Sequence, residues 1–197
     1  IQKMAEAVPY LVGGSADLAP STKTLIDDSD DVGPGAFTGR NFHFGIREHG
    51  MAGIMSGMAL HRGFRIFGAT FFVFLDYCRP SVRLAALMKL PVIYVFTHDS
   101  VFVGEDGPTH QPIEQMAILR ATPGLTEFRP ADATETAAAW VAALRHTDGP
   151  VAMMLTRQNL PIIDRETCAP ASMVAKGAYT LWQSRKGDPD LILMASG

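Results

Sequence analysis

Short apolar runs alternate with longer, helix-like segments along most of the chain. Glycine, proline or polar residues bound each run, as is typical of strands that are buried on both faces. The segments between the runs are rich in alanine, leucine and methionine, which favour helix. Strand and helix in regular succession predict an α/β fold in three layers (α/β/α), with helices on both faces of a mostly parallel sheet.

The pattern predicts the positions of these elements. We expect strands at residues 10–13, 41–44, 65–69, 92–97, 125–129 and 151–156. We expect helices at residues 47–61, 71–88, 114–120 and 134–145, the last of them capped by Asp132.

Two stretches depart from the alternation. Residues 15–40 are rich in Asp, Ser, Pro and Gly and predict a long loop, which in a compact domain tends to be functional or mobile. After Asn159 the alternation fades, so we expect residues 1–160 to form one domain and residues 161–175 to be a linker. The closing DLILMASG predicts a strand that would open a further domain, which suggests a piece of a longer polypeptide.

Composition narrows the class of protein. Of the 197 residues 47% are hydrophobic and 19% charged, and the net charge of −3 gives no reason to expect nucleic acid or an acidic membrane as a partner. No apolar run is long enough to span a membrane, and no signal peptide is visible. Cys78 and Cys168 fit no zinc or redox spacing, so we expect reduced thiols and a cytoplasmic location.

The loop THDSVFVGEDGPTHQP follows the strand expected at 92–97 and concentrates ionisable side chains. It holds His98, Asp99, Glu105, Asp106 and His110, and open α/β sheets bind ligands at such strand ends. A plain surface loop is one alternative. A metal site at His98, Asp106 and His110 is another, although their spacing matches no standard zinc or iron pattern. Hydrogen bonding to a polyhydroxylated ligand fits these side chains best.

An acid and three aromatic residues are further candidates. Glu48 lies where a short strand turns into a helix, so helix capping is an alternative to a chemical role. Phe71, Phe74 and Tyr77 recur every third residue, which is roughly one face of a helix. Such a stripe is more often core than a cofactor site.

Two more strand ends carry anion-binding chemistry. Arg157 follows the strand expected at 151–156, and arginine suits bidentate binding of an anion, although a surface salt bridge is equally open. GGSADLAPS, residues 13–21, offers hydroxyls and backbone N–H groups to a phosphate but matches no nucleotide-binding fingerprint. One rim that binds an anionic, hydroxyl-rich small molecule accounts for all of these features.

GGSADLAPS, FGIREHGM, TFFVFLDY, THDSVFVGEDGPTHQP and TRQNL occur in this order in transketolases, so residues 10–160 resemble the central, pyrimidine-binding domain of that family. The closing DLILMASG resembles the strand that leads into the family's C-terminal domain. The resemblance implies an enzyme of the pentose phosphate pathway. Such an enzyme moves a two-carbon ketol unit from a ketose phosphate to an aldose phosphate, using thiamine diphosphate and Mg²⁺ or Ca²⁺.

The resemblance also implies roles for single residues. The family's glutamate at the position of Glu48 hydrogen-bonds N1′ of the aminopyrimidine and helps to activate thiazolium C2. The remaining implied cofactor contacts are Phe71, Phe74 and Tyr77 around the aminopyrimidine, and Asp17 near the thiazolium. The implied substrate contacts are His98, Asp106 and His110 to sugar hydroxyls, with both histidines handling protons, and Ser21 and Arg157 to the phosphate.

The family holds the diphosphate and the metal with a GDG-containing motif on a separate N-terminal domain, and this sequence contains no such motif. The cofactor lies between that domain of one subunit and the pyrimidine domain of the other, which implies a homodimer and an inactive isolated chain. Three related enzymes remain as alternatives: dihydroxyacetone synthase, deoxyxylulose phosphate synthase and a dehydrogenase E1 β subunit. A catalytically silent assembly module is the non-enzyme alternative.

Overall fold

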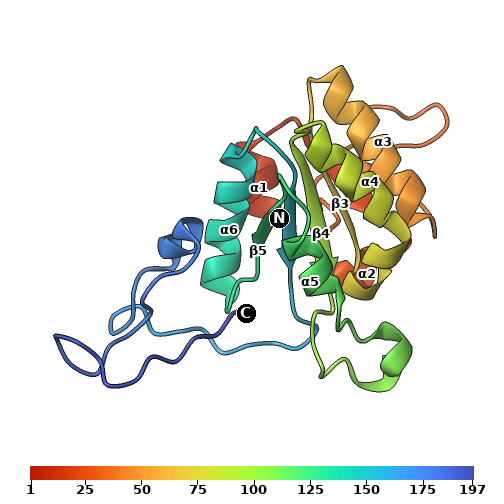
Figure 1. Cartoon of the computed structure of the whole chain (residues 1–197). Coiled ribbons are helices and arrows are strands. Elements are labelled where there is room, and N and C mark those ends of the chain that lie inside the picture. Colours follow the sequence, from red (N-terminus) through yellow and green to blue (C-terminus); the bar gives the residue numbers. More distant parts are fainter.

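The computed structural model describes all 197 residues and is built around one six-stranded sheet. All strand pairs are parallel, and the strand order is β2-β1-β3-β4-β6-β5 (Figure 1). The strands are β1 (Leu11–Ser15), β2 (Asn41–His43), β3 (Arg65–Phe71), β4 (Val92–Thr97), β5 (Thr126–Phe128) and β6 (Val151–Met154).

Helices cover both faces of the sheet (Figure 1). The α-helices are α1 (Gln2–Ala7), α2 (Ala19–Thr22), α3 (Glu48–His61), α4 (Leu75–Leu87), α5 (Gln115–Arg120) and α6 (Ala133–Arg145). One hydrophobic core lies between the sheet and α3, α4 and α5, and a second lies between the sheet and α1 and α6. The predicted three-layer α/β/α fold with a parallel sheet is therefore confirmed. None of the helices is long and apolar enough to cross a membrane.

Most element ends agree with the sequence within two residues, but the aromatic segment differs. Strand β3 continues to Phe71, and a 3₁₀ turn, Phe72–Phe74, precedes α4. The strand extends because the ladder with β4 pairs Thr70 with Phe96 and Phe71 with Thr97. The prediction that Phe71, Phe74 and Tyr77 share one helix is therefore wrong, since they lie on a strand, a 3₁₀ turn and an α-helix.

The Met51 and Met55 side chains of α3 pack directly on β3 at Gly68, which has no side chain. A Cβ atom on Gly68 would lie 2.3 Å from Sδ of Met55 and 3.2 Å from Sδ of Met51. Side chains two apart on a strand share a face, so Thr70 points to the same side as this contact. The close approach brings the beginning of α3, at Glu48, next to the end of β3.

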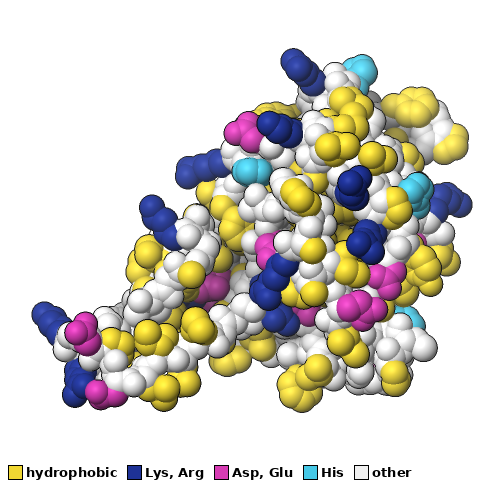
Figure 2. Space-filling model, in the orientation of Figure 1, with side chains coloured by type: hydrophobic (Ala, Val, Ile, Leu, Met, Phe, Trp, Pro, Cys, Tyr) yellow, Lys and Arg dark blue, Asp and Glu magenta, His cyan; other side chains and the backbone are white.

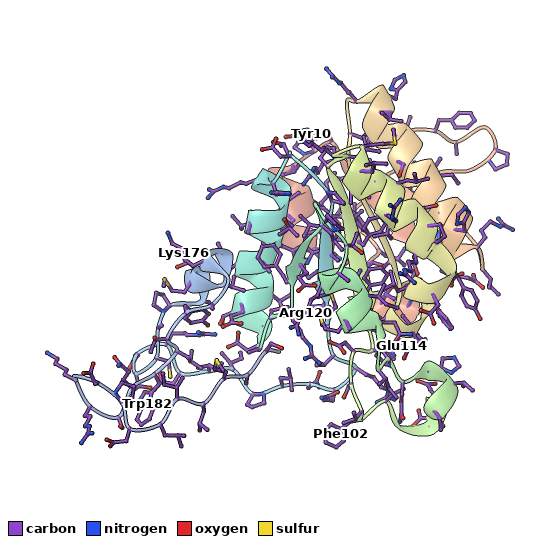
Figure 3. All side chains as sticks on the ribbon, in the orientation of Figure 1. Tyr10, Phe102, Glu114, Arg120, Lys176 and Trp182 are labelled. Carbon is purple, nitrogen blue, oxygen red and sulfur yellow. The ribbon has the colours of Figure 1, made fainter.

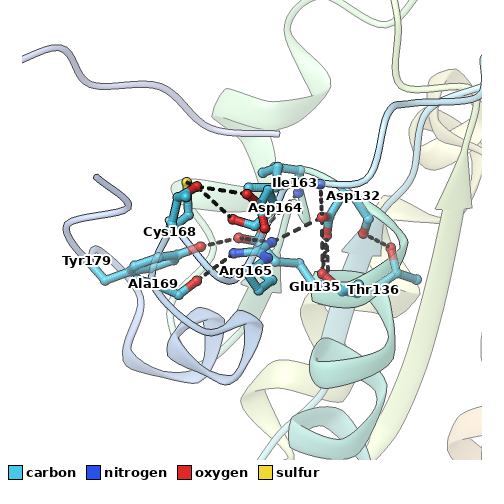
Figure 4. A network of polar contacts seen from close by, with 12 residues as sticks. Asp132, Glu135, Thr136, Ile163, Asp164, Arg165, Cys168, Ala169 and Tyr179 are labelled. Atoms are coloured by element: carbon cyan, nitrogen blue, oxygen red, sulfur yellow. Dashed lines mark hydrogen bonds and ion pairs between the residues drawn. The ribbon is translucent and has the colours of Figure 1, made fainter. Parts of the chain in front are cut away.

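Residues 161–175, expected to be a linker, are anchored on α6 through a network of polar contacts (Figure 4). Asp132 caps α6 as predicted, accepting a hydrogen bond from the Glu135 N–H at 2.8 Å. The same carboxylate accepts from the Ile163 N–H at 2.9 Å and from Arg165 Nη2 at 3.1 Å. Arg165 and the Tyr179 hydroxyl also reach the Glu135 carboxylate.

The chain loops away from the sheet after residue 176 and then returns, so that Ser196 accepts hydrogen bonds from Nη1 of Arg129, next to β5 (Figure 1). Trp182 is 62% exposed, and the side chains around it point outward (Figure 3). Residues 190–197 form no strand with this sheet, so the strand expected for DLILMASG stays a prediction for a further domain. A strand needs a paired neighbour for its backbone groups, and residues 190–197 pair with none of the six strands.

The Asp132 network predicts acid sensitivity. Burial alone raises the pKa of Asp132, but hydrogen bonds from the backbone of Glu135 and Ile163, from Thr134 and from Arg165 lower it to about 2. Because this folded value is below the ordinary 3.8, the network stabilises the fold above about pH 4 and loses that effect as the pH falls towards 2. Asp132→Asn should lower the free energy of unfolding at pH 7 by about 2 kcal/mol. The substitution should also make the free energy of unfolding less dependent on pH between 4 and 2, as measured by urea unfolding. Equal pH dependence in both proteins would contradict this account.

Candidate active site

The candidate residues gather at one edge of the sheet because parallel strands end on the same side. Chain order brings them there from five strands: Asp17 and Ser21 follow β1, Glu48 follows β2, Phe71 ends β3, His98 follows β4 and Arg157 follows β6. Strands β2 and β3 lie on opposite sides of β1, so the chain changes direction at β1. Ligands of open α/β sheets bind at such switch points.

Phe71, Phe74 and Tyr77 form a continuous row of rings despite lying on three different elements. The rings of Phe71 and Phe74 are 6.0 Å apart and nearly parallel at 5°, and those of Phe74 and Tyr77 are 5.7 Å apart at 27°. A 3₁₀ turn has three residues per turn, which places residues three apart on one side. Phe71 is buried but Tyr77 is 63% exposed, so the row has an open aromatic surface.

Both histidines of the loop after β4 fold back onto this row. The His98 ring stacks on Phe71 with centroids 3.7 Å apart, and the His110 ring stands edge-on to Phe71 and Phe74 at 6.3 and 5.5 Å. The Thr97 hydroxyl lies 3.0 Å from Nδ1 of His98. His98 has a φ of 62°, a left-handed conformation that costs a non-glycine residue about 1–2 kcal/mol. The tip of the loop, at Phe102, lies beyond the sheet edge (Figure 3).

Glu48 lies at the end of β3, the strand on which the aromatic row begins. It is the first residue of α3, where the helix dipole favours an acid, and only 6% of it is exposed. Its Oε1 accepts a hydrogen bond from Oγ1 of Thr70 at 3.3 Å. Since Thr70 and Phe71 are the last two residues of β3, the carboxyl group of Glu48 lies at the end of the strand where the row begins.

A hollow of about 310 Å³ opens between the ends of β1, β4 and β6, and Ser21, Lys23, His98 and Arg157 line it. Arg157 is partly exposed and pairs with the Glu105 carboxylate at 3.2 Å. This is the surface salt bridge left open by the sequence, and such exposed pairs contribute only about 0–1 kcal/mol. An anion that enters the hollow can therefore replace Glu105 as the partner of Arg157 at little cost in free energy.

Asp106 and Asp17 differ in how the structure places them. The negative charge of Asp106 raises the pKa of His98, although no hydrogen bond joins the two side chains. Asp17 is exposed, has a left-handed φ of 63°, and makes no hydrogen bond or ion pair with the other candidates. No group of three or more His, Cys, Asp or Glu side chains is arranged to hold a metal ion, which leaves the metal interpretation of His98, Asp106 and His110 without support.

The charges around His98 predict opposite effects of two substitutions. Burial lowers the pKa of His98, Asp106 raises it, and Arg157 and His110 lower it, so the ring is neutral at pH 7. Asp106→Asn should lower this pKa further, whereas Arg157→Met should raise it. Titration of the His98 ring by NMR in the two variants checks this directly. Shifts in the same direction would show that the three side chains do not form one cluster.

Several contacts of the site were not found from the sequence. Thr70 and Thr97 bond to Glu48 and His98, and a bidentate ion pair joins Asp99 to Arg129 at 2.6 and 3.3 Å across the end of β6. Each threonine immediately precedes a candidate residue, which is the only signal the sequence offers. Asp99 and Arg129 are thirty residues apart, and only the strand order brings them together.

Comparison with known proteins identifies the family of this chain. Residues 1–162 match the family model described as "Transketolase, pyrimidine binding domain". The transketolase of Bacillus subtilis strain 168 is 57% identical over 98% of this chain, and that of Geobacillus stearothermophilus is 55% identical over all of it. The chain spans only 29% and 30% of these two proteins.

Solved structures of transketolases have the same fold as this chain. A transketolase from Pichia stipitis in complex with sedoheptulose 7-phosphate superposes with a TM-score of 0.88 at 44% identity, over 95% of this chain and 28% of that one. A split-gene transketolase described as an inactive β4 tetramer superposes with a TM-score of 0.66 at 32% identity, over 82% of this chain and 50% of that one. The chain therefore belongs to the transketolase family, in which it corresponds to the pyrimidine-binding domain.

Proposed function

We propose that this domain supplies the pyrimidine-binding half of a thiamine diphosphate site in a transketolase. The whole protein then transfers a two-carbon ketol unit from a ketose phosphate to an aldose phosphate. The observation that carries the proposal is the buried Glu48 carboxyl group at the end of β3, the same strand end at which an open aromatic row begins. The family membership supports it.

The residues present fit the aminopyrimidine of thiamine diphosphate. A flat aromatic ring needs apolar surface on its faces and a hydrogen-bonding group at its nitrogens. Phe71, Phe74 and Tyr77 offer the surface, and Glu48 offers a carboxyl group at the same end of β3. When bound, the cofactor supplies the carbanion chemistry that neither carboxyl nor imidazole groups provide. We assign Asp17 to the thiazolium side, because it follows β1 at the same sheet edge.

Proton handling falls to Glu48 and the two histidines. Glu48 holds a proton at the aminopyrimidine ring nitrogen. His98 is neutral at pH 7 and can accept or donate one proton at the substrate hydroxyls, and His110 faces the same rings. Asp106 opposes the effect of burial on His98 and binds a further hydroxyl.

Arg157 and Ser21 hold the substrate phosphate in the hollow. The guanidinium group offers paired N–H donors to phosphate oxygens, and its present partner Glu105 is exposed and weakly held. The Pichia stipitis relative is described in complex with a sugar phosphate, which supports the same class of substrate here.

The remainder of the site lies outside this domain. We assign Mg²⁺ or Ca²⁺ and the diphosphate to another domain of the whole protein, and the complete site to a homodimer. Exposed apolar side chains on α3 and α4, among them Ile54, Leu84 and Leu87, leave a face suited to a partner surface (Figure 2). The chain's share of its relatives, about 29%, leaves room for such domains.

The isolated 197-residue chain should therefore transfer no ketol unit and should bind thiamine diphosphate weakly at best. The split-gene relative is described as an inactive tetramer, in line with this expectation. Product formation from sugar phosphates with saturating cofactor and Mg²⁺ measures the activity, and full-length protein in the same assay is the control. Robust transfer by the chain alone would overturn the division of the site between domains.

The choice of acceptor tests the proposed function itself. Full-length protein with xylulose 5-phosphate should transfer its ketol unit to ribose 5-phosphate much faster than to formaldehyde. A preference for formaldehyde would instead identify a dihydroxyacetone synthase.

A further inference from the structure

The two oxygens of the Glu48 carboxyl group have different surroundings. Oε1 accepts the hydrogen bond of Thr70 at 3.3 Å. Oε2 has no hydrogen-bond partner, yet it is not among the polar atoms that are buried without one. A carboxyl group with one oxygen held and the other accessible has a fixed direction. Only the accessible oxygen is left for a ligand.

Thr70 is a rigid partner for Glu48. Thr70 is fully buried in β3, a strand that lies between β1 and β4. Its backbone is fixed in the ladder opposite Phe96. A β-branched side chain has few rotamers, so the hydroxyl position follows from the strand. The contact of Gly68 with Met55 and Met51 sets the spacing between β3 and α3. Strand and helix together thus fix the distance between the hydroxyl and the carboxyl group.

We propose that Thr70 is a positioning residue that holds Oε1 of Glu48 and leaves Oε2 as the atom that exchanges a proton with the cofactor. This inference rests on the proposed function of Glu48. In a protonated carboxyl group the oxygen that accepts a hydrogen bond from a hydroxyl is the carbonyl oxygen. The acidic proton then lies on the other oxygen. When the carboxyl group is ionised, the same hydroxyl still donates to Oε1. Thr70 therefore keeps Oε2 in place in both states of Glu48.

The test compares variants at position 70 in the full-length protein. Thr70→Val removes the hydroxyl at nearly constant shape, Thr70→Ala removes it with a smaller side chain, and Thr70→Ser keeps it. Thr122→Val is the matched control, because the Thr122 hydroxyl bonds only to the Ile118 carbonyl at the end of α5, away from the site. Three readouts are thermal unfolding, the Kd of thiamine diphosphate for the cofactor-free protein, and the exchange of the cofactor's C2 proton for deuterium.

Thr70→Val and Thr70→Ala should weaken cofactor binding and slow C2 exchange by about tenfold each, the effect of one lost hydrogen bond. The KM for sugar phosphates should stay unchanged. Thr70→Ser and Thr122→Val should behave as the unmodified protein. A purely structural role would lower the melting temperature without changing C2 exchange.

Two outcomes would overturn the inference. In the first, Thr70→Val or Thr70→Ala folds and behaves as the unmodified protein while Glu48→Gln abolishes exchange, so the role of Glu48 stands and that of Thr70 falls. In the second, Thr70→Ser is as impaired as Thr70→Val, and the hydroxyl is not the group that matters. If Glu48→Gln also leaves exchange unchanged, the proposed function fails together with this inference.

Discussion

Replacing Glu48 by glutamine in the full-length protein is expected to lower kcat by about 10²–10⁴-fold, the range of positioned acid–base groups. Glutamine keeps the size of the side chain and can still accept the Thr70 hydrogen bond, but it cannot release or take up a proton. The KM for sugar phosphates should change little, because Arg157 and Ser21, not Glu48, line the hollow. Steady-state kinetics at saturating thiamine diphosphate measures both quantities.

Glu114→Gln is the matched control, since Glu114 is exposed before α5 and makes no side-chain cap. It should leave kcat unchanged. Glu48→Ala should be at least as impaired as Glu48→Gln. Unchanged kcat in a folded Glu48→Gln protein would refute the role of Glu48 and favour a catalytically silent assembly module.

Replacing Arg157 by methionine is expected to raise the KM for sugar phosphates by about 10–100-fold, because hydrogen bonds to charged groups contribute about 1.5–3 kcal/mol. The kcat at saturating substrate should remain near that of the unmodified protein. A donor without a phosphate should be used equally well by both proteins. This comparison isolates the phosphate, and assays over a range of salt concentrations should show a weaker salt dependence for Arg157→Met.

Arg120→Met is the matched control for the arginine. Arg120 is an exposed residue at the end of α5 that pairs with Glu127, away from the hollow. Its replacement should leave the KM unchanged. An equal loss for phosphorylated and unphosphorylated donors in Arg157→Met would show that Arg157 acts on the loop structure and not on the phosphate.

The fold could be predicted largely from local pattern. Buried parallel strands are short and apolar, and their turn residues mark the ends, so each of the six strands was located. The segment at Thr70 and Phe71 was misassigned because threonine and phenylalanine favour strands while their spacing also fits a helix. Pairing with β4, which is a tertiary effect, places Thr70 and Phe71 in the strand.

The gathering of the candidate residues was predictable where chain order alone places them, at the ends of strands. Glu48, His98 and Arg157 were selected in this way, and the roles that the resemblance to a family implies for them stay predictions. Contacts between distant residues were not predictable. Arg165 reaches Asp132 across 33 positions, and Thr70 reaches Glu48 across 22 positions, where α3 packs on β3. Such contacts depend on packing that no local pattern encodes.

The central claim is that this domain forms part of a thiamine diphosphate site for ketol transfer. The most direct measurement is the formation of a seven-carbon ketose phosphate from xylulose 5-phosphate and ribose 5-phosphate by full-length protein, with and without thiamine diphosphate. We predict product only with the cofactor present, and its loss in Glu48→Gln. No product with the cofactor, or equal product in its absence, would contradict the claim.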